Sequence, residues 1–373
     1  MIYLDNNATT RLLPPVRDAV LPWLDGEYGN PSSPNAAGQR AREALVRARR
    51  QVAEALGAGA AEAVFTSGAT ESNHMAILGA LQYGVGRRRV VSSQVEHAAT
   101  LKLLRWLESQ GRIELVLLPV DGQGALDLDA LQAAVTPDTA LVTLMWANNE
   151  TGVLFPVEQA AELAHAQGAL FHTDAVQAVG KVALDWRSQP FDLLSFSGHK
   201  LHAPKGVGAL LVRKGLNLPP LLFGSQERGR RGGTENLPGI VGLGEALAAL
   251  DVAGAGRIAA LRDGFEQDVR AALPWVRVNG RARVCNTSNL CFAGLDGEAL
   301  MMRLERDGVV AALGSACQSG GNAASHVLRA CGLSEAEARG SLRFSLSRLT
   351  TAAEMAQAAE RVIRTAAALR QGF

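Results

Sequence analysis

The sequence predicts an α/β fold, with a mostly parallel sheet between helices and a second, smaller α+β domain. Along roughly the first two thirds of the chain, short apolar runs of strand length alternate with helix-like segments. Several of these runs are continuously apolar, as in strands that are covered on both faces. After about residue 250 the pattern changes to a mixture of strands and helices, which indicates the second unit.

The elements follow from spacing and from their end signals. Residues 40–56 form the first long predicted helix, because apolar residues recur at helical spacing and Gly57 follows as a C-cap. A further helix is predicted at residues 157–167. The predicted strands of the large sheet are residues 63–66, 89–92, 115–119, 140–146, 169–173, 193–197 and 208–212. In the second unit we expect strands at 283–292 and 340–345, and helices at 251–270, 297–306 and 351–370.

Composition excludes several classes of protein. The 37 basic and 36 acidic residues leave a formal charge of +1, which argues against nucleic acid or an anionic membrane as a partner. No apolar run reaches the roughly 18 residues that a bilayer span requires. The start lacks a basic segment typical of a signal peptide. Four cysteines without a close pair predict neither a disulfide framework nor a metal site. We therefore expect a soluble, cytoplasmic protein.

Lysine is scarce, and this narrows the search for a reactive amine. Of the 37 basic residues, five are lysines, and arginine forms no imine with a carbonyl under ordinary conditions. Lys200 has the best context, because it follows a predicted strand and a histidine among small residues. Partial desolvation there would lower the pKa of its amine and make it a better nucleophile. Lys205, between Pro204 and Gly206, is the nearest competitor.

Other polar residues follow the predicted strand ends, where ligands bind in such sheets. Gly68, Ala69 and Thr70 would present backbone N–H groups to an anion such as phosphate, although an ordinary turn with a capping side chain explains them equally well. Asp174 follows a buried strand and could pair with a protonated pyridine nitrogen, or simply cap the next turn. His97 lies at the same edge, although a lone histidine is more often structural.

The cysteines differ in their surroundings. Cys317 lies in GSACQSGGNAAS, a run of small and polar residues typical of a mobile loop, so we predict an exposed and reactive thiol. The other three cysteines, at positions 285, 291 and 331, occur among apolar residues. They are interpreted as small buried hydrophobic residues.

Taken together, the motifs resemble those of the NifS/IscS-type cysteine desulfurases, which are class V aminotransferase-like, fold-type I enzymes that use pyridoxal 5′-phosphate (PLP). The shared blocks are YLDNNATT, GNPSS, FTSGATESN, EH, NNETG, HTDAVQ, SFSGHK, RGGTEN, GSAC and RFSLSR, in the family's order. The resemblance implies a large PLP-binding domain over residues 15–255. It also implies a small domain of residues 1–14 and 256–373 that carries the cysteine loop.

The resemblance also implies roles for residues around the cofactor. Lys200 would form the Schiff base with PLP and move the substrate's α-proton. Asp174 would pair with the pyridinium nitrogen, and Gln177 and Asn149 would contact the O3′ side of the ring. His97 would stack on the ring and assist proton transfer.

The cofactor phosphate and the substrate carboxylate would have their own contacts. Ala69, Thr70, Ser197 and His199 would hold the phosphate. Thr234 would reach the phosphate in the partner subunit, so the resemblance implies a homodimer with shared sites. Arg343 would clamp the substrate carboxylate through two parallel hydrogen bonds, and Asn149 would also contact the substrate.

The implied reaction removes sulfur from L-cysteine, leaving L-alanine and a persulfide on Cys317. The sulfur would pass to an acceptor protein for iron–sulfur cluster, thio-cofactor or tRNA biosynthesis, with no direct contact to nucleic acid or membrane. Three alternatives remain: a selenocysteine lyase or another PLP-dependent reaction, a non-catalytic PLP-fold regulator, and a redox sensor that uses Cys317. Two departures from the family pattern are Asn35, where a histidine is common, and the sequence AALGSAC before the nucleophile.

Overall fold

The structure is a computed structural model that describes residues 1–84, 86–314 and 324–372. Within these residues, the largest sheet has seven strands in the order β2-β8-β7-β6-β5-β3-β4. Strand β8 is antiparallel to both of its neighbours, and the other pairs are parallel. The strands are β2 (Ala63–Thr66), β3 (Arg89–Ser93), β4 (Glu114–Leu118), β5 (Thr139–Met145), β6 (Leu170–Asp174), β7 (Leu193–Ser197) and β8 (Gly208–Val212). The predicted mostly parallel sheet is confirmed.

Helices cover both faces of this sheet, and successive strand residues pack into different clusters. Phe65 and Leu194 belong to one hydrophobic core, whereas their neighbours Val64 and Leu193 belong to another on the opposite face. This alternation follows from the two-residue repeat of a strand. The helices of this part are α1 (Pro14–Leu24), α2 (Ala36–Leu56), α3 (Ala69–Tyr83), α4 (Ala98–Ser109), α5 (Leu128–Ala134), α6 (Val157–Ala166) and α7 (Leu237–Ala248), with short turns η1 (Gly198–Lys200) and η2 (Gln226–Gly229).

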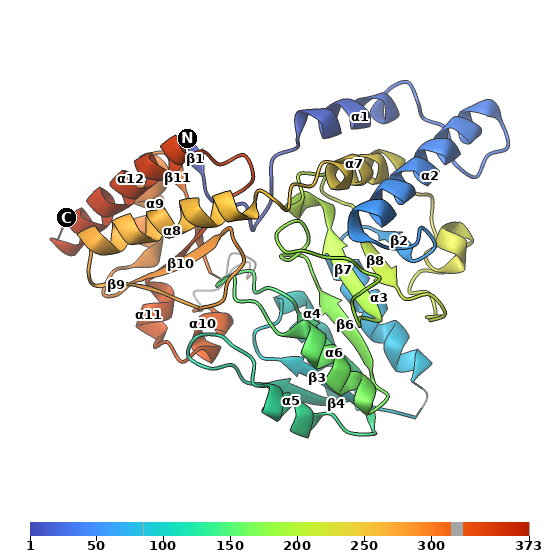
Figure 1. The fold of residues 1–373 in the computed structure, drawn as a ribbon, viewed down its shortest axis with the longest axis horizontal. Coiled ribbons are helices and arrows are strands. Elements are labelled where there is room, and N and C mark those ends of the chain that lie inside the picture. Colours follow the sequence, from blue (N-terminus) through green and yellow to red (C-terminus); the bar gives the residue numbers. More distant parts are fainter. Residues whose placement is uncertain (85, 315–323, 373) are drawn as a thin grey trace.

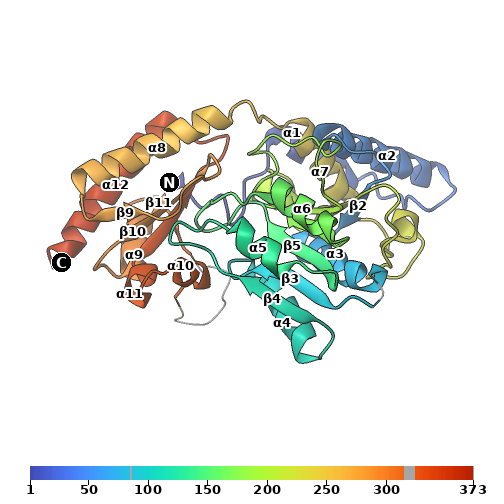
Figure 2. The same cartoon turned by 60° about the horizontal axis from the view of Figure 1, so that its bottom comes forward.

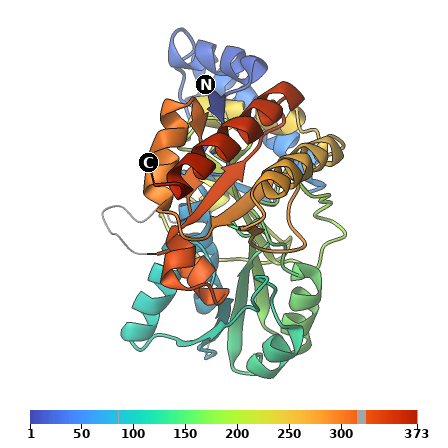
Figure 3. The ribbon, with the colours of Figure 1, turned by 90° about the vertical axis from the view of Figure 1, so that its left-hand side faces the viewer.

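A separate core is formed by the chain ends. It joins Ile2 and Leu4 to Phe265, Phe292 and Phe344. Figure 1 shows its helices α8, α9 and α12 gathered on the left, away from the large sheet, and Figure 2 keeps the two groups apart after rotation. In Figure 3, which faces this second unit, α12 lies in front of its strands.

The second unit has two small sheets among the described residues. Four antiparallel strands have the order β12-β13-β10-β9, and β1 pairs with β11 in parallel. The elements are β1 (Ile2–Tyr3), α8 (Ala255–Ala272), β9 (Val276–Val278), β10 (Thr287–Phe292), α9 (Gly297–Arg306), β11 (Val309–Val310), β12 (Ala312–Leu313), α10 (His326–Ala330), α11 (Glu335–Arg339), β13 (Ser341–Ser345) and α12 (Ala352–Arg370).

Three predicted starts are wrong by four residues. The helix expected from residue 40 begins at Ala36, after Asn35 caps it by accepting a hydrogen bond from Gly38 N (2.9 Å). The helix expected from residue 251 begins at Ala255, because the Asp251 side chain accepts a hydrogen bond from Gly254 N (3.0 Å) and closes a turn before it. The strand expected from residue 283 begins at Thr287. Arg283 makes only an isolated bridge with Val153, and its guanidinium pairs with Glu266 instead. Among the described residues, no helix is long and apolar enough to cross a membrane.

Candidate active site

A cavity of about 610 Å³ opens where the carboxyl ends of the parallel strands face the second unit. Of the predicted site residues that the structure describes, all line it except Thr234. The predicted residues that the cavity brings together are Ala69, Thr70, His97, Asn149, Asp174, Gln177, Ser197, His199, Lys200 and Arg343. The volume is within the usual range for a cofactor with a small substrate.

Lys200 ends the turn η1 that directly follows β7. Its amine donates to two main-chain carbonyls, Asn7 O at 2.5 Å and Ala8 O at 2.7 Å. Lys205 also lines the cavity but is exposed. The partly buried Lys200 is therefore held in the cavity wall by the N-terminal segment, whereas Lys205 extends toward solvent.

Asp174 is the last residue of β6 and is 7% exposed. Asn73, on α3, donates from Nδ2 to Asp174 Oδ2 at 2.6 Å, and Val176 N donates to Oδ1 at 3.0 Å. The contact with Val176 is the turn contact that the simpler interpretation expects. Because Asp174 also lines the cavity, its carboxylate can serve as an anionic partner there as well.

One end of the cavity is suited to an anion. Helix α3 begins after Gly68. Among the described residues no side chain caps its first turn, so neither Ser67 nor Thr70 has the capping role. Uncapped N–H groups at a helix start attract negative charge. His199 lines the same cavity, and burial together with Lys200 and Lys205 lowers its pKa to about 4, so this imidazole is neutral at pH 7.

Gln177 has a fixed orientation. Its Nε2 donates to Asn7 O at 3.1 Å, and its Oε1 accepts from Lys181 Nζ at 2.6 Å. Burial lowers the pKa of Lys181 to about 7, and the nearby Lys200 and Arg343 act in the same direction. Asn7 thereby connects Gln177 to Lys200 through a single carbonyl oxygen.

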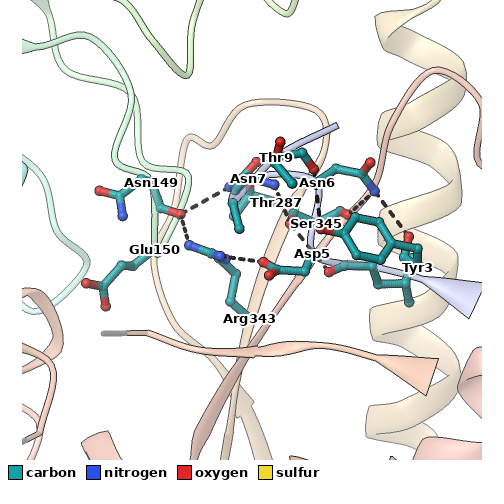
Figure 4. A network of polar contacts seen from close by, with 12 residues as sticks. Tyr3, Asp5, Asn6, Asn7, Thr9, Asn149, Glu150, Thr287, Arg343 and Ser345 are labelled. Atoms are coloured by element: carbon teal, nitrogen blue, oxygen red, sulfur yellow. Dashed lines mark hydrogen bonds and ion pairs between the residues drawn. The ribbon is translucent and has the colours of Figure 1, made fainter. Parts of the chain in front are cut away.

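Arg343 extends from β13 into the cavity and is 3% exposed. Its Nη2 lies 2.6 Å from Asp5 Oδ1, and its Nη1 donates to Asn149 O at 2.9 Å. Figure 4 shows the guanidinium between these two acceptors, with Asn7 donating to the same Asn149 oxygen. Its Nε is buried without an acceptor among the described residues. The cation predicted to bind a carboxylate thus already has a carboxylate partner.

His97 both caps a helix and lines the cavity. Its ring Nδ1 accepts from Ala99 N at 3.2 Å and caps α4, which places the proton of a neutral ring on Nε2. The ring also lines the cavity. His326, at the start of α10, lines the cavity too and lies 3.1 Å from the carbonyl of Glu96. The helix-capping contact expected of a structural histidine therefore occurs at the cavity wall.

Glu150 is a buried carboxyl group that the sequence analysis missed. It is 3% exposed, and its Oε2 lies 2.5 Å from Ser325 Oγ. Burial raises its pKa to about 7, although the contact with Ser325 and the charges of Arg343 and His97 act against the rise. Its place in NNETG, directly after a predicted strand, was the available signal.

Among the described site residues, Thr234 does not line the cavity. Thr234 is exposed on the segment before α7, and its contact with a partner subunit stays a prediction. Cys317 lies outside the described residues. Among the described residues, the ones lining the cavity that are nearest to it in sequence are Gly314 and His326.

Comparisons with known proteins agree with this architecture. The aminotransferase class-V model matches residues 2–357. A cysteine desulfurase of Cereibacter sphaeroides is 52% identical over 95% of this chain and 92% of its own length. The cysteine desulfurase NifS of Azotobacter vinelandii is 46% identical, with coverage of 97% and 91%. The chain belongs to the cysteine desulfurase family.

Solved structures support the same placement. A NifS-like protein superposes with a TM-score of 0.90 at 32% identity, covering 97% of this chain and 98% of its own. The structure described as SspA in complex with cysteine has a TM-score of 0.84 at 35% identity, with coverage of 94% and 100%. The predicted family and fold are confirmed, and class-V aminotransferase-like cysteine desulfurases are PLP enzymes.

Proposed function

We propose that this protein is a PLP-dependent cysteine desulfurase that converts L-cysteine into L-alanine and leaves the sulfur as a persulfide on Cys317. One observation carries the proposal: the amine of Lys200, the carboxylate of Asp174 and the guanidinium of Arg343 converge on a single cavity. The relatives named cysteine desulfurase support the reaction, and the neighbour whose title mentions cysteine supports the substrate.

The residues of the cavity fit PLP. The uncapped start of α3, with Ser197 and His199, offers neutral donors to a phosphate. Asp174 offers a buried carboxylate, oriented by Asn73, to a protonated ring nitrogen. When bound, PLP supplies the electron sink that lets an amino acid lose its α-proton and its sulfur.

The chain's own side chains hold the substrate and move protons. Arg343 faces the cavity and binds the carboxylate, with the peptide carbonyl of Asn149 fixing the guanidinium. Lys200 first holds the cofactor and then accepts the α-proton at Nζ, within a wall formed by Asn7 and Ala8. His97 lines the same cavity and assists at its ring nitrogen.

The sulfur leaves the substrate by nucleophilic attack. The thiolate of Cys317 forms a bond to the substrate sulfur while the bond from that sulfur to the β-carbon breaks, and a proton restores the methyl group of alanine. Cysteine and enzyme thiol thus become alanine and enzyme persulfide, with no external oxidant. In vitro, an added reductant reduces the persulfide and releases sulfide.

We further propose a homodimer in which Thr234 contacts the cofactor phosphate of the partner's site. The persulfide sulfur then passes to an acceptor protein for iron–sulfur cluster, thio-cofactor or tRNA biosynthesis. The exposed position of Thr234 leaves it available to a second subunit.

The test is an assay of purified PLP-loaded protein with L-cysteine and a reductant, in which alanine and sulfide are both quantified. We expect equal amounts of the two products, and a loss of at least about 100-fold in Cys317→Ser because the nucleophile is gone. Cys331→Ser is the matched control. Burial raises the pKa of the Cys331 thiol to about 11, so it stays protonated and should not be needed.

The outcomes separate the possible readings. PLP-loaded protein that forms no alanine contradicts the proposed reaction. Equal loss of activity in both cysteine variants contradicts the role of Cys317 as the specific acceptor of sulfur.

A further inference from the structure

Arg343 faces the cavity but already forms an ion pair with Asp5. The side chains of Arg343 and Asp5 are 4% and 17% exposed, and their ion pair is 2.6 Å long. Asp5 lies 338 residues before Arg343 and reaches it because the N-terminal segment runs beside β13, with a bridge between Asp5 and Ser345. A buried guanidinium without a counter-charge would be costly, so Asp5 stabilises Arg343 before any ligand arrives.

The same pairing weakens the attraction of Arg343 for a second carboxylate. An amino acid bound there places its own negative charge near Asp5, so that two carboxylates share one guanidinium. Arg343 also acts on the buried Glu150, but burial raises the pKa of Glu150 to about 7, so this carboxyl group is in part uncharged at pH 7. The carboxyl group in direct contact with the guanidinium, among the described residues, is that of Asp5.

Geometry and charge can be separated at this position. Asn149 O holds Nη1 of Arg343 independently of Asp5. An asparagine at position 5 keeps an oxygen acceptor for Nη2 but carries no charge. The orientation of the guanidinium then persists, while the competing carboxylate disappears.

We propose that Asp5 is a positioning residue that acts through Arg343 and, by competing for its guanidinium, limits the affinity of the cavity for amino-acid carboxylates. The proposal rests on the proposed function, in which both L-cysteine and L-alanine bind through their carboxylates. Because substrate and product share this group, a pocket that bound it more tightly would retain alanine. Asp5 thus favours release of the product at the expense of substrate affinity.

The experiment compares two ligands that differ in the carboxylate. PLP-loaded full-length protein is titrated at equilibrium with L-alanine and with ethylamine, the amine that lacks the carboxylate, and binding is followed by absorbance. In Asp5→Asn we expect the Kd of L-alanine to fall about three- to tenfold, the size of a partly screened charge interaction. The Kd of ethylamine should not change. In turnover, the KM for L-cysteine should fall while kcat does not rise.

A matched control tests whether any buried ion pair has this effect. Glu266 pairs with Arg283 at 2.6 Å, and both side chains are 10% exposed, outside the cavity. Glu266→Gln removes the same charge from a similar pair, and should leave both Kd values unchanged. Asp5→Ser is a second neutral replacement with the same expectation as Asp5→Asn, should the asparagine variant not fold.

Each result has a defined meaning. An unchanged or higher Kd for L-alanine in the neutral variants overturns the proposal. Equal weakening of L-alanine and ethylamine also overturns it, because Asp5 would then only maintain the fold. If the unsubstituted protein makes no alanine from cysteine, the proposed function fails instead. A protein that desulfurates cysteine while Asp5→Asn behaves identically refutes only the role of Asp5.

Discussion

Glu150 illustrates how burial changes the chemistry of one side chain. Its carboxyl group ionises at about 7 in the folded protein, compared with an ordinary pKa of 4.5. The main cause is loss of hydration. Glu150 is 3% exposed, so its charged form would have little contact with water. Between these two pH values the folded state retains a proton that the unfolded chain releases, so this group makes stability fall as pH rises.

We predict that Glu150→Gln reduces this loss of stability. From pH 5 to pH 8 the unsubstituted protein should lose about 2–3 kcal/mol more unfolding free energy than the variant, since glutamine cannot titrate. Thermal unfolding at the two pH values measures the difference. Glu162→Gln, exposed on α6, is the control and should retain the original pH dependence. Identical pH dependence in Glu150→Gln would show that Glu150 is ionised in the folded state throughout.

At the scale of elements, β8 and the start of α3 approach each other too closely for side chains. A Cβ at Gly208 would lie 2.8 Å from Gly68 Cα and 2.7 Å from Phe196 O, both of which belong to the main chain. Gly68 itself has φ +151°, which residues with a side chain rarely adopt. This contact sets the position of the α3 N-terminus at the anion end of the cavity.

We predict that Gly208→Ala displaces that N-terminus and weakens PLP binding by about tenfold or more. The variant should also unfold at lower temperature, because overpacking typically costs about 1–3 kcal/mol. Titration of PLP into the cofactor-free protein measures the affinity. Gly256→Ala, at an open position on α8, is the control and should keep the affinity with equal or higher stability. An unchanged affinity in Gly208→Ala would remove this contact from the phosphate site.

At the scale of the whole molecule, the two ends of the chain complete the cavity. Ile2 and Leu4 pack into the second core, and the residues that follow reach the cavity, where Asn7 and Ala8 hold Lys200. The large sheet and the helices that follow its strands thus supply the residues that we propose hold the cofactor, and the second unit supplies Arg343. The proposed dimer adds Thr234 from another subunit.

Mixed dimers test that last contribution. Lys200→Ala and Thr234→Ala subunits are combined, and the mixed dimer is purified through different affinity tags. If Thr234 acts on the partner's site, one site contains both native residues, and activity should recover to about half that of the unsubstituted dimer. If Thr234 acts within its own subunit, the site with Lys200 lacks Thr234, and the mixed dimer should be no better than Thr234→Ala.

Local sequence patterns were enough to predict the α/β class, the strands of the large sheet, and Lys200 and Asp174 as candidate site residues. These follow from local patterns, since continuous apolar runs specify buried strands and polar residues at their ends meet at one sheet edge. Helix and strand boundaries failed where side chains acted locally, as at Asp251, or where Arg283 preferred an ion pair. Such contacts compete with the hydrophobic pattern and leave no periodic signal.

Which charges meet depends on how distant segments of the chain pack together. The sequence places Asp5 and Arg343 at opposite ends of the chain, and nothing in their spacing indicates a pair. They meet because the N-terminal segment enters the second core and then, after β1, runs beside β13, where Asp5 forms a bridge with Ser345. The burial of Glu150 has the same origin, as Ser325 approaches it from 175 residues away. Fold class follows from local patterns of apolar residues. The charges and protonation states of the site depend on long-range packing, which excludes water from these groups.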